Sequence, residues 1–156
     1  MAITKKKADL KDVLPKIRTY CNYRDRCHKE VRDKLYELGL WRQDVNTAIT
    51  QMIEENLLNE ERYARSYVRG HFYNKHWGKV RIVAELKARQ VHSRMITMAM
   101  EEIDESDYEA TIQKLIEKKS KELTGNQFER KQKMSRYLAQ KGYAYADFSQ
   151  LLSRVK

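Results

Sequence analysis

The feature that most constrains the fold of this chain is an internal repeat of roughly fifty residues. When the sequence is shifted by 51 and by 103 positions, six apolar positions recur in three copies. The copies are Val31, Leu35, Leu40, Val45, Ile49 and Met52; Ile82, Leu86, Val91, Ile96, Met100 and Ile103; and Met134, Leu138, Tyr143, Phe148, Leu152 and Val155. Such repeats stack on their neighbours, because a unit this small is marginal alone. The chain is therefore expected to be a short tandem array.

Each copy is expected to be helical. Apolar residues recur at helical spacing, and no segment alternates with a period of two between hairpin turns. Gly39 and Gly142 hold equivalent positions in the first and third copies, where a left-handed residue ends a helix. Gln90 takes that place in the middle copy.

Several residues are expected at helix starts. Pro15 is placed in the first turn of a helix, where its missing N–H is harmless. The expected N-caps are Asn59, Ser93 and Asp147, together with a capping box that begins at Ser106.

The predicted fold is all-α, with three tandem three-helix repeats that form an elongated, curved array. The predicted boundaries are a flexible basic tail at 1–8 and repeats at 9–57, 58–105 and 106–156, of which the second is basic. Arrays of this kind offer one long face to a partner.

Basic residues are concentrated in the middle repeat. The chain carries 32 Lys and Arg against 22 Asp and Glu, a net charge of +10. Residues 62–94 hold nine basic residues and one acid, whereas 101–109 hold six acids and no base. The basic window indicates a polyanionic partner, either nucleic acid or an acidic protein surface, with an ordinary charged helix surface as the alternative. The acidic run is expected to solvate a turn and to place negative charge at the next helix N-terminus.

The candidate contact residues lie in this window. On a helix from Glu60 to about Tyr73, three arginines share one stripe beside an apolar stripe that is expected in the core. The candidate partner- or DNA-binding residues are Arg62, Arg65, Arg69, Tyr73, Lys75, Lys79, Arg81, Lys87 and Arg89. As an alternative, Arg62 or Arg81 forms a structural ion pair with Glu60, Glu61 or Glu85.

Two aromatic residues of the window have open roles. Tyr73 and Trp77 lie in an expected turn between helices, where exposed rings beside cations stack on unpaired bases. For Trp77 the favoured alternative is that its ring fills the seam between two repeats. For Tyr73 neither the stacking role nor a structural role is preferred.

Other chemistry has little support. Cys21, Cys27 and His28 lack the spacing of a zinc site, and no phosphate loop or catalytic triad pattern is present. We therefore expect no metal, no cofactor and no enzymatic activity. No apolar run is long enough to span a membrane, and residues 5–7 are not followed by the apolar stretch of a signal peptide. A cytoplasmic monomer is the default expectation.

The middle repeat resembles the central signature of RecX regulatory proteins. The matching residues are Leu58-Asn59-Glu60-Glu61-Arg62-Tyr63-Ala64, Tyr67-Val68-Arg69, Trp77-Gly78-Lys79-Val80-Arg81-Ile82 and Glu85-Leu86. Upstream, Arg26-Cys27, Glu30-Val31, Lys34-Leu35 and Leu38-Gly39-Leu40 are similar to the first repeat of that family. Asn59 and Glu60 stand where the family usually has two acids.

The resemblance implies a function as well as a fold. RecX proteins modulate RecA, the recombinase that polymerises on single-stranded DNA. The chain is thus expected to bind the RecA nucleoprotein filament and to inhibit its extension, ATPase and strand exchange, which would modulate recombinational repair and the SOS response. The alternative is a single- or double-stranded DNA-binding protein that affects RecA by competing for DNA. A helical scaffold for an unrelated acidic protein is a third possibility.

Overall fold

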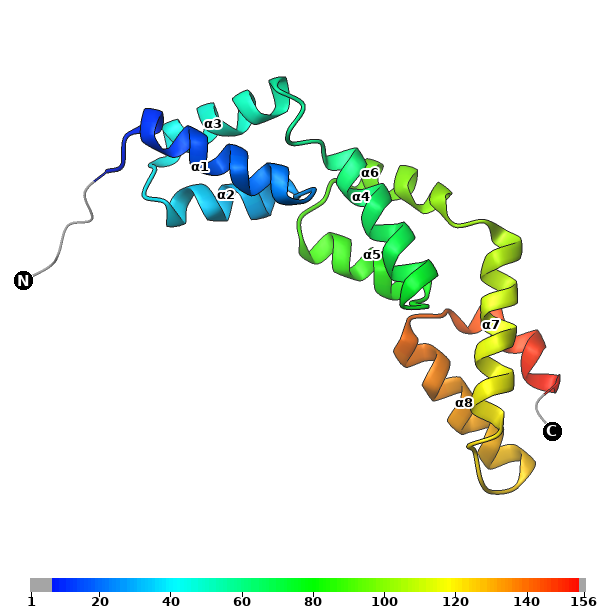
Figure 1. Cartoon of the computed structure of the whole chain (residues 1–156). Coiled ribbons are helices and arrows are strands. Elements are labelled where there is room, and N and C mark those ends of the chain that lie inside the picture. Colours follow the sequence, from blue (N-terminus) through cyan, green and yellow to red (C-terminus); the bar gives the residue numbers. More distant parts are fainter. Residues whose placement is uncertain (1–6, 155–156) are drawn as a thin grey trace, which may run out of the picture. The chain divides into compact units, whose positions relative to one another are not determined.

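The computed structural model describes residues 7–154, and every regular element in that range is helical (Figure 1). The α-helices are α1 (Leu10–Tyr23), α2 (His28–Glu37), α3 (Arg42–Glu54), α4 (Glu60–Arg69), α5 (Lys79–Ala88), α6 (Ser93–Ala99), α7 (Glu105–Ser120), α8 (Gln127–Lys141) and α9 (Tyr145–Phe148). Three shorter segments are η1 (Gly70–Asn74), a π-helical turn, and the 3₁₀ turns η2 (Met100–Glu102) and η3 (Ser149–Arg154). The all-α prediction is confirmed. Most of the predicted tail, residues 1–6, lies outside the described range, as does Val155.

The chain divides into two compact units, and the middle repeat contributes to both. The first unit contains the described residues up to Ser66 together with Leu86–Ile96. The second contains Tyr67–Glu85 and the described residues from Thr97 onward. Within residues 7–154, no helix combines the length and the apolar character that a bilayer crossing requires.

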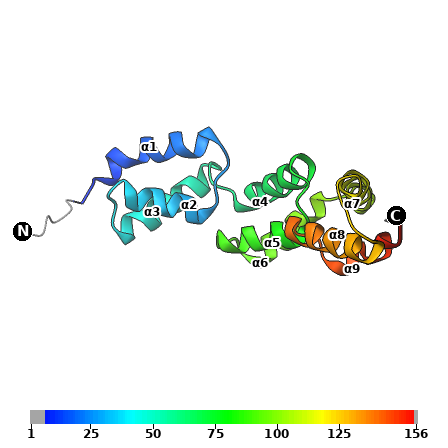
Figure 2. The ribbon, with the colours of Figure 1, turned by 90° about the horizontal axis from the view of Figure 1, so that it is seen from below.

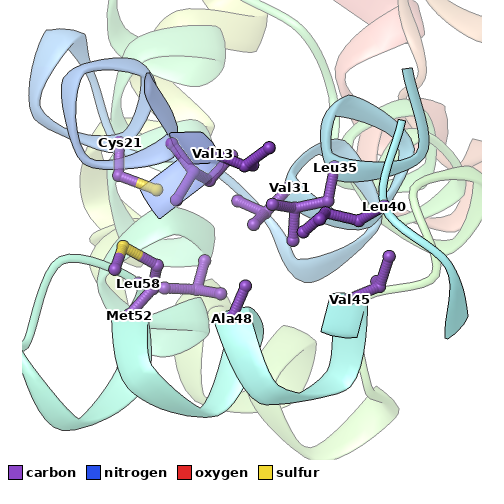
Figure 3. Close-up of a cluster of buried hydrophobic side chains, with 10 residues drawn as sticks. Val13, Cys21, Val31, Leu35, Leu40, Val45, Ala48, Met52 and Leu58 are labelled. Carbon is purple, nitrogen blue, oxygen red and sulfur yellow. The ribbon is translucent and has the colours of Figure 1, made fainter. Parts of the chain in front are cut away.

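The first unit is organised around a core between α1, α2 and α3, which pack against one another (Figure 2). Figure 3 shows the side chains of this core, which come from all three helices and from the segments that follow α2 and α3. They are Val13, Ile17, Cys21, Val31, Leu35, Leu40, Val45, Ala48, Met52 and Leu58. Burial of apolar area at this scale is the main force that holds the three helices together.

The repeat register predicted from the sequence is confirmed by burial. Leu35, Leu86 and Leu138 are each completely buried at the same position in three helices, α2, α5 and α8. The matched sets Val31, Ile82, Met134 and Val45, Ile96, Phe148 are also buried. One apolar pattern therefore builds equivalent helices in each copy.

The ends of these three helices share one backbone geometry. Gly39, Gln90 and Gly142 have φ angles of 97°, 59° and 101°. In each case the next residue donates its N–H to the carbonyl five residues earlier, for example Leu40 to Leu35 at 3.2 Å. This is the Schellman motif, which satisfies the free carbonyls of a helix end. The left-handed conformation predicted for Gly39 and Gly142 is confirmed, and Gln90 adopts it as well in the middle copy.

Three of the expected N-caps are wrong: Ser93, Ser106 and Asp147. His92 caps α6, because its Nδ1 atom accepts the N–H two residues later at 3.1 Å. Asp104 caps α7 and accepts the N–H groups two and three residues later at 2.9 and 3.1 Å. Asp147 lies inside α9. Another acceptor occurs one or two residues before each expected cap of α6 and α7, so these helices start earlier than their apolar pattern suggests.

Pro15 lies deeper in its helix than predicted. It is the sixth residue of α1, because the Asp9 side chain accepts the N–H of Lys11 at 3.1 Å and starts the helix earlier. Pro15 is exposed, so its ring faces away from the core of the first unit. The helix tolerates the missing N–H at this solvent-facing position.

The helix that starts at Glu60 extends as predicted, but its end is a π-helical turn. α4 runs directly into η1, and the backbone reverses at His76, which has a φ of 58°. The Nδ1 atom of His71 lies 2.8 Å from the carbonyl oxygen of Tyr67, and the two rings stack at 3.7 Å. A π-helical turn adds a residue to the turn and so changes which side chains face inward. Here it buries Phe72 completely.

In the second unit, the loop before α5 meets the end of α8 backbone to backbone. The Gly78 N–H donates to the Lys141 carbonyl at 2.8 Å, and the Val80 N–H donates to the Gly142 carbonyl at 2.9 Å. A Cβ atom on Gly78 would lie 2.3 Å from the carbonyl carbon and oxygen of Gly142. Glycine is therefore required at position 78 by the close approach of another backbone.

Aromatic rings continue this contact between the middle and third repeats. The Tyr108 ring lies 5.5 Å from Phe72 and 5.3 Å from Tyr143, measured between ring centroids. The Tyr143 hydroxyl donates to the His76 carbonyl at 2.7 Å, and the Tyr108 hydroxyl accepts the Lys79 N–H at 3.0 Å. Burial raises the pKa of Tyr108 to about 12. Burial therefore favours the neutral form of the Tyr108 hydroxyl in this cluster.

Candidate partner-binding surface

The candidate residues begin on α4, whose first turn is fixed by two polar side chains. Asn59 is the N-cap, as predicted, and accepts the Arg62 N–H at 3.0 Å. Glu60 accepts two backbone N–H groups at 3.2 Å each, from His28 at the start of α2 and from His92 before α6. One carboxylate thus serves the N-termini of two helices from different repeats, where negative charge is favourable. This fixes the start of α4, which belongs to the first unit.

Arg62 and Arg65 both have acidic neighbours in the first unit. The Nε atom of Arg62 lies 2.7 Å from Asp25 in the loop before α2, and its Nη2 donates to the Asn56 carbonyl at 3.2 Å. The geometry favours the structural ion pair for Arg62, although its partner differs from the acids considered from the sequence. Arg65 pairs with Glu61, one helical turn earlier, at 3.2 Å.

In the second unit, three candidate residues contact the acidic run at 101–109. Arg69 lies 3.1 Å from Glu102, and Lys79 forms an ion pair with Glu105. The Tyr73 hydroxyl donates to Asp107 at 2.8 Å, and this hydrogen bond raises the pKa of Tyr73. The acidic run therefore does more than solvate a turn, because it neutralises part of the basic window and anchors η1 to α7.

Lys75 and Arg81 are exposed and gather around the half-buried ring of Trp77. The Arg81 guanidinium lies 3.7 Å from the ring centroid, and the Lys75 ammonium lies 5.5 Å from it. The Trp77 ring also contacts His71 at 4.6 Å. These neighbours all belong to its own repeat, and the seam role for Trp77 stays a prediction. Two cations beside an indole form a surface suited to an anionic partner.

The nine candidate residues are divided between the two units. Arg62, Arg65, Lys87 and Arg89 belong to the first, and Arg69, Tyr73, Lys75, Lys79 and Arg81 belong to the second. Lys87 is exposed on α5, and Arg89 is partly buried after it. Three residues remain exposed without an acidic partner among residues 7–154, namely Lys75, Arg81 and Lys87.

Sequence reasoning missed a second basic cluster, which lies on the third repeat. Partial burial lowers the pKa of Lys141, and the charges of Arg81, from the middle repeat, and of Lys118 lower it further. The signal was present in the sequence, because residues 114–141 hold nine basic residues and three acids. The net charge of the whole chain does not reveal this second cluster, since the acids at 101–109 offset its positive charge.

The cysteines are packing residues in this fold. Cys21 and Cys27 are both buried free thiols, and burial raises the pKa of each. Such thiols are protonated at neutral pH and are poor nucleophiles and ligands. Among residues 7–154, no three His, Cys, Asp or Glu side chains are grouped closely enough to hold a metal ion.

A tandem array of three-helix repeats with a partly neutralised basic surface places the chain among helical-repeat binding proteins. Two family models match it: "RecX, second three-helix domain" at residues 59–100 and "RecX, third three-helix domain" at 106–152. Regulatory protein RecX of Vibrio campbellii is 35% identical over 130 residues, which cover 83% of each chain. The chain therefore belongs to the RecX family of regulatory proteins, as its motifs predicted.

Other relatives agree with this assignment. Regulatory protein RecX of Clostridium perfringens is 32% identical over 130 residues, which cover 81% of this chain and 60% of that protein. The crystal structure of RecX from Lactobacillus salivarius has a TM-score of 0.86 over 94% of this chain and 96% of that chain, at 22% identity. The solved structure supports the fold.

Proposed function

We propose that this protein is a non-enzymatic regulator that binds the RecA nucleoprotein filament and inhibits its extension, ATPase and strand exchange. The observation that carries the proposal is membership of the RecX family, which rests on identity over most of the chain. In this role the protein acts as a monomer in the cytoplasm and modulates recombinational repair and the response to DNA damage.

We propose different roles for the paired and the unpaired cations of the basic window. Arg62, Arg69 and Lys79 are engaged in ion pairs within the fold, so we assign them first to stability. Lys75 and Arg81 are exposed beside Trp77, and we propose them as the primary contacts with an acidic protein surface or with DNA. An exposed cation gives more to a complex than one already paired, because no internal ion pair must break.

The repeats suggest how such a contact inhibits a filament. In this proposal, the three repeats expected at 9–57, 58–105 and 106–156 each contact a subunit of the polymer. A protein bound to more than one subunit gains affinity from multivalency and favours one arrangement of those subunits. Extension and strand exchange both require the filament to change, so a bound regulator of this kind opposes both.

The test is the DNA-dependent ATPase of purified RecA on single-stranded DNA, titrated with this protein at near-physiological salt. The proposal expects inhibition at well below one protein per RecA, because one bound regulator affects many subunits. Inhibition only when the DNA is saturated would instead support the competing function, direct DNA binding. No inhibition at any ratio would overturn both.

A further inference from the structure

A groove lined by cations lies on the third repeat, between the C-terminal part of α7 and α8, which pack against each other (Figure 1). Its volume is about 360 Å³, and no acidic side chain lines it. The lining residues are Lys119, Leu123, Lys133, Arg136, Tyr137 and Gln140. Four of these lie on α8, where Arg136 and Tyr137 are each three or four residues from both Lys133 and Gln140, so the four share one face of that helix.

Tyr137 is the aromatic centre of the groove. The Lys119 ammonium lies 4.8 Å from its ring centroid, and the Lys141 ammonium lies 5.7 Å from it. The ring is half-buried, so it is held in place while part of it remains open to solvent. A partly exposed ring with two ammonium groups near it is thus available in the groove.

Positive charge is only partly neutralised here. Lys119 pairs with Glu122 at 3.3 Å, and Lys133 donates to the Thr124 carbonyl at 2.8 Å. Among the described residues, Arg136 and Lys141 have no acidic partner. Partial burial lowers the pKa of Lys141, and the charges of Arg81 and Lys118 lower it further. Like charges crowded together in this way are stabilised when an anion is bound.

We propose that this groove binds single-stranded nucleic acid, with its cations on the phosphates and Tyr137 against a sugar or base. Sites for single strands combine a basic groove with a ring on which bases stack, and both are present within one repeat. An acidic peptide would use the cations alone, because a carboxylate gains nothing from the ring. The observations therefore favour a nucleotide chain.

The groove can be tested separately from the filament proposal. It lies outside the window at 62–94, apart from the nearby Arg81, and its test contains no RecA. A negative result here leaves the filament proposal standing, and a positive result does not establish it.

The test is binding of a fluorescent oligothymidylate to the full-length protein, measured by anisotropy over a range of salt. Three variants are compared with wild type: Arg136→Gln/Lys141→Gln, Tyr137→Ala and Tyr137→Phe. The matched control is Lys16→Gln/Arg42→Gln, which removes two exposed cations from α1 and α3 in the first unit. Circular dichroism melting confirms that each variant is folded.

The double charge variant is expected to lower the slope of log affinity against log salt by about 1.4, which corresponds to two lost phosphate contacts. Tyr137→Ala is expected to weaken binding about fivefold or more, and Tyr137→Phe is expected to bind like wild type because the ring is kept. The control variant is expected to change neither the salt dependence nor the affinity of binding. The proposal would be overturned if the control variant lost as much affinity as the groove variants. It would also be overturned if Arg136→Gln/Lys141→Gln and Tyr137→Ala both bound like wild type. Equally tight binding of an oligoglutamate of matched charge would reassign the groove to acidic proteins.

Discussion

The two contacts that join neighbouring repeats use different chemistry. In the first unit, the start of α4 is held by charge, through Glu60 at two helix N-termini and the Arg62–Asp25 pair. In the second unit, Gly78 and Gly142 bring two backbones together, and three buried aromatic rings extend the contact. We call these the charged junction and the backbone junction.

The difference separates the cations of residues 62–94 that hold the repeats together from those that are available to a partner. Charged contacts at protein surfaces are screened by salt and contribute little each, whereas a backbone contact without space for a methyl group tolerates almost no change. The cations of the window that serve the junctions are mostly paired. Lys75 and Arg81 have no acidic partner among residues 7–154, so they are available to bind another molecule.

The largest effect is expected from Gly78→Ala. The new methyl group would meet the Gly142 carbonyl at 2.3 Å, so the backbones must separate, at a cost of about 3 kcal/mol in the free energy of unfolding. Urea denaturation measures this loss. The matched control is Gly70→Ala, because nothing lies within 4 Å of a Cβ atom at that position. A small effect of Gly78→Ala would show that the backbone junction is loose.

A smaller effect is expected from Glu60→Gln at the charged junction. A glutamine has one acceptor oxygen in place of two and carries no charge, so one of the two helix N-termini loses its acceptor. We expect a loss of about 1–2 kcal/mol.

Thermal unfolding measures this change, and faster hydrogen exchange at the His28 and His92 amides locates it. Glu61→Gln is the control, since Glu61 pairs only within its own helix turn with Arg65 among the contacts described for it. That pair is expected to contribute about 0.5 kcal/mol or less. Equal effects of the two variants would contradict the bridging role of Glu60.

The Arg62–Asp25 pair is expected to contribute less than Glu60 does. Its side chains are about one third exposed, at 38% and 33%, so solvent screens their attraction. A double-mutant cycle with Arg62→Ala and Asp25→Ala is expected to give a coupling free energy of about 0.5–1 kcal/mol, which falls as salt is added. A coupling that is insensitive to salt would mean that packing, and not charge, joins these residues.

The smallest effect is expected from mild alkali at the backbone junction. The pKa of Tyr108 is raised by burial to about 12, so its contribution is complete below the unfolded pKa of about 10 and is lost as pH rises toward 12. At about pH 10.5 the loss is expected to be below about 1 kcal/mol. The difference in stability between wild type and Tyr108→Phe, followed against pH, measures it. A difference in stability that does not depend on pH would contradict the claim that burial raises the pKa of Tyr108.

The repeat register and the helix ends were predictable because their signals are local. Apolar spacing places Leu35, Leu86 and Leu138, and the backbone requirement at a helix end places Gly39 and Gly142. The same reasoning failed for Ser93 and Ser106, because several nearby side chains are equally able to cap. Nothing in the sequence indicated the π-helical turn at 70–74, which depends on packing around Phe72.

The site was less predictable because it depends on contacts between distant residues. Arg62 and Asp25 are 37 positions apart, and no spacing rule connects them. The groove at Tyr137 was missed because charge was compared between one window and the remainder of the chain. A windowed count would have found the basic residues at 114–141, although the acid-free lining appears only in three dimensions.

The central claim is that cations left exposed by the two junctions contact the RecA filament. The most direct measurement compares Lys75→Glu/Arg81→Glu with Lys16→Glu/Arg42→Glu, a control on exposed cations of α1 and α3, in the RecA ATPase assay. We predict that the first variant needs about tenfold more protein for half inhibition, which corresponds to about 1.4 kcal/mol, and that the control inhibits like wild type. Wild-type inhibition by Lys75→Glu/Arg81→Glu, with both variants folded, would contradict the claim.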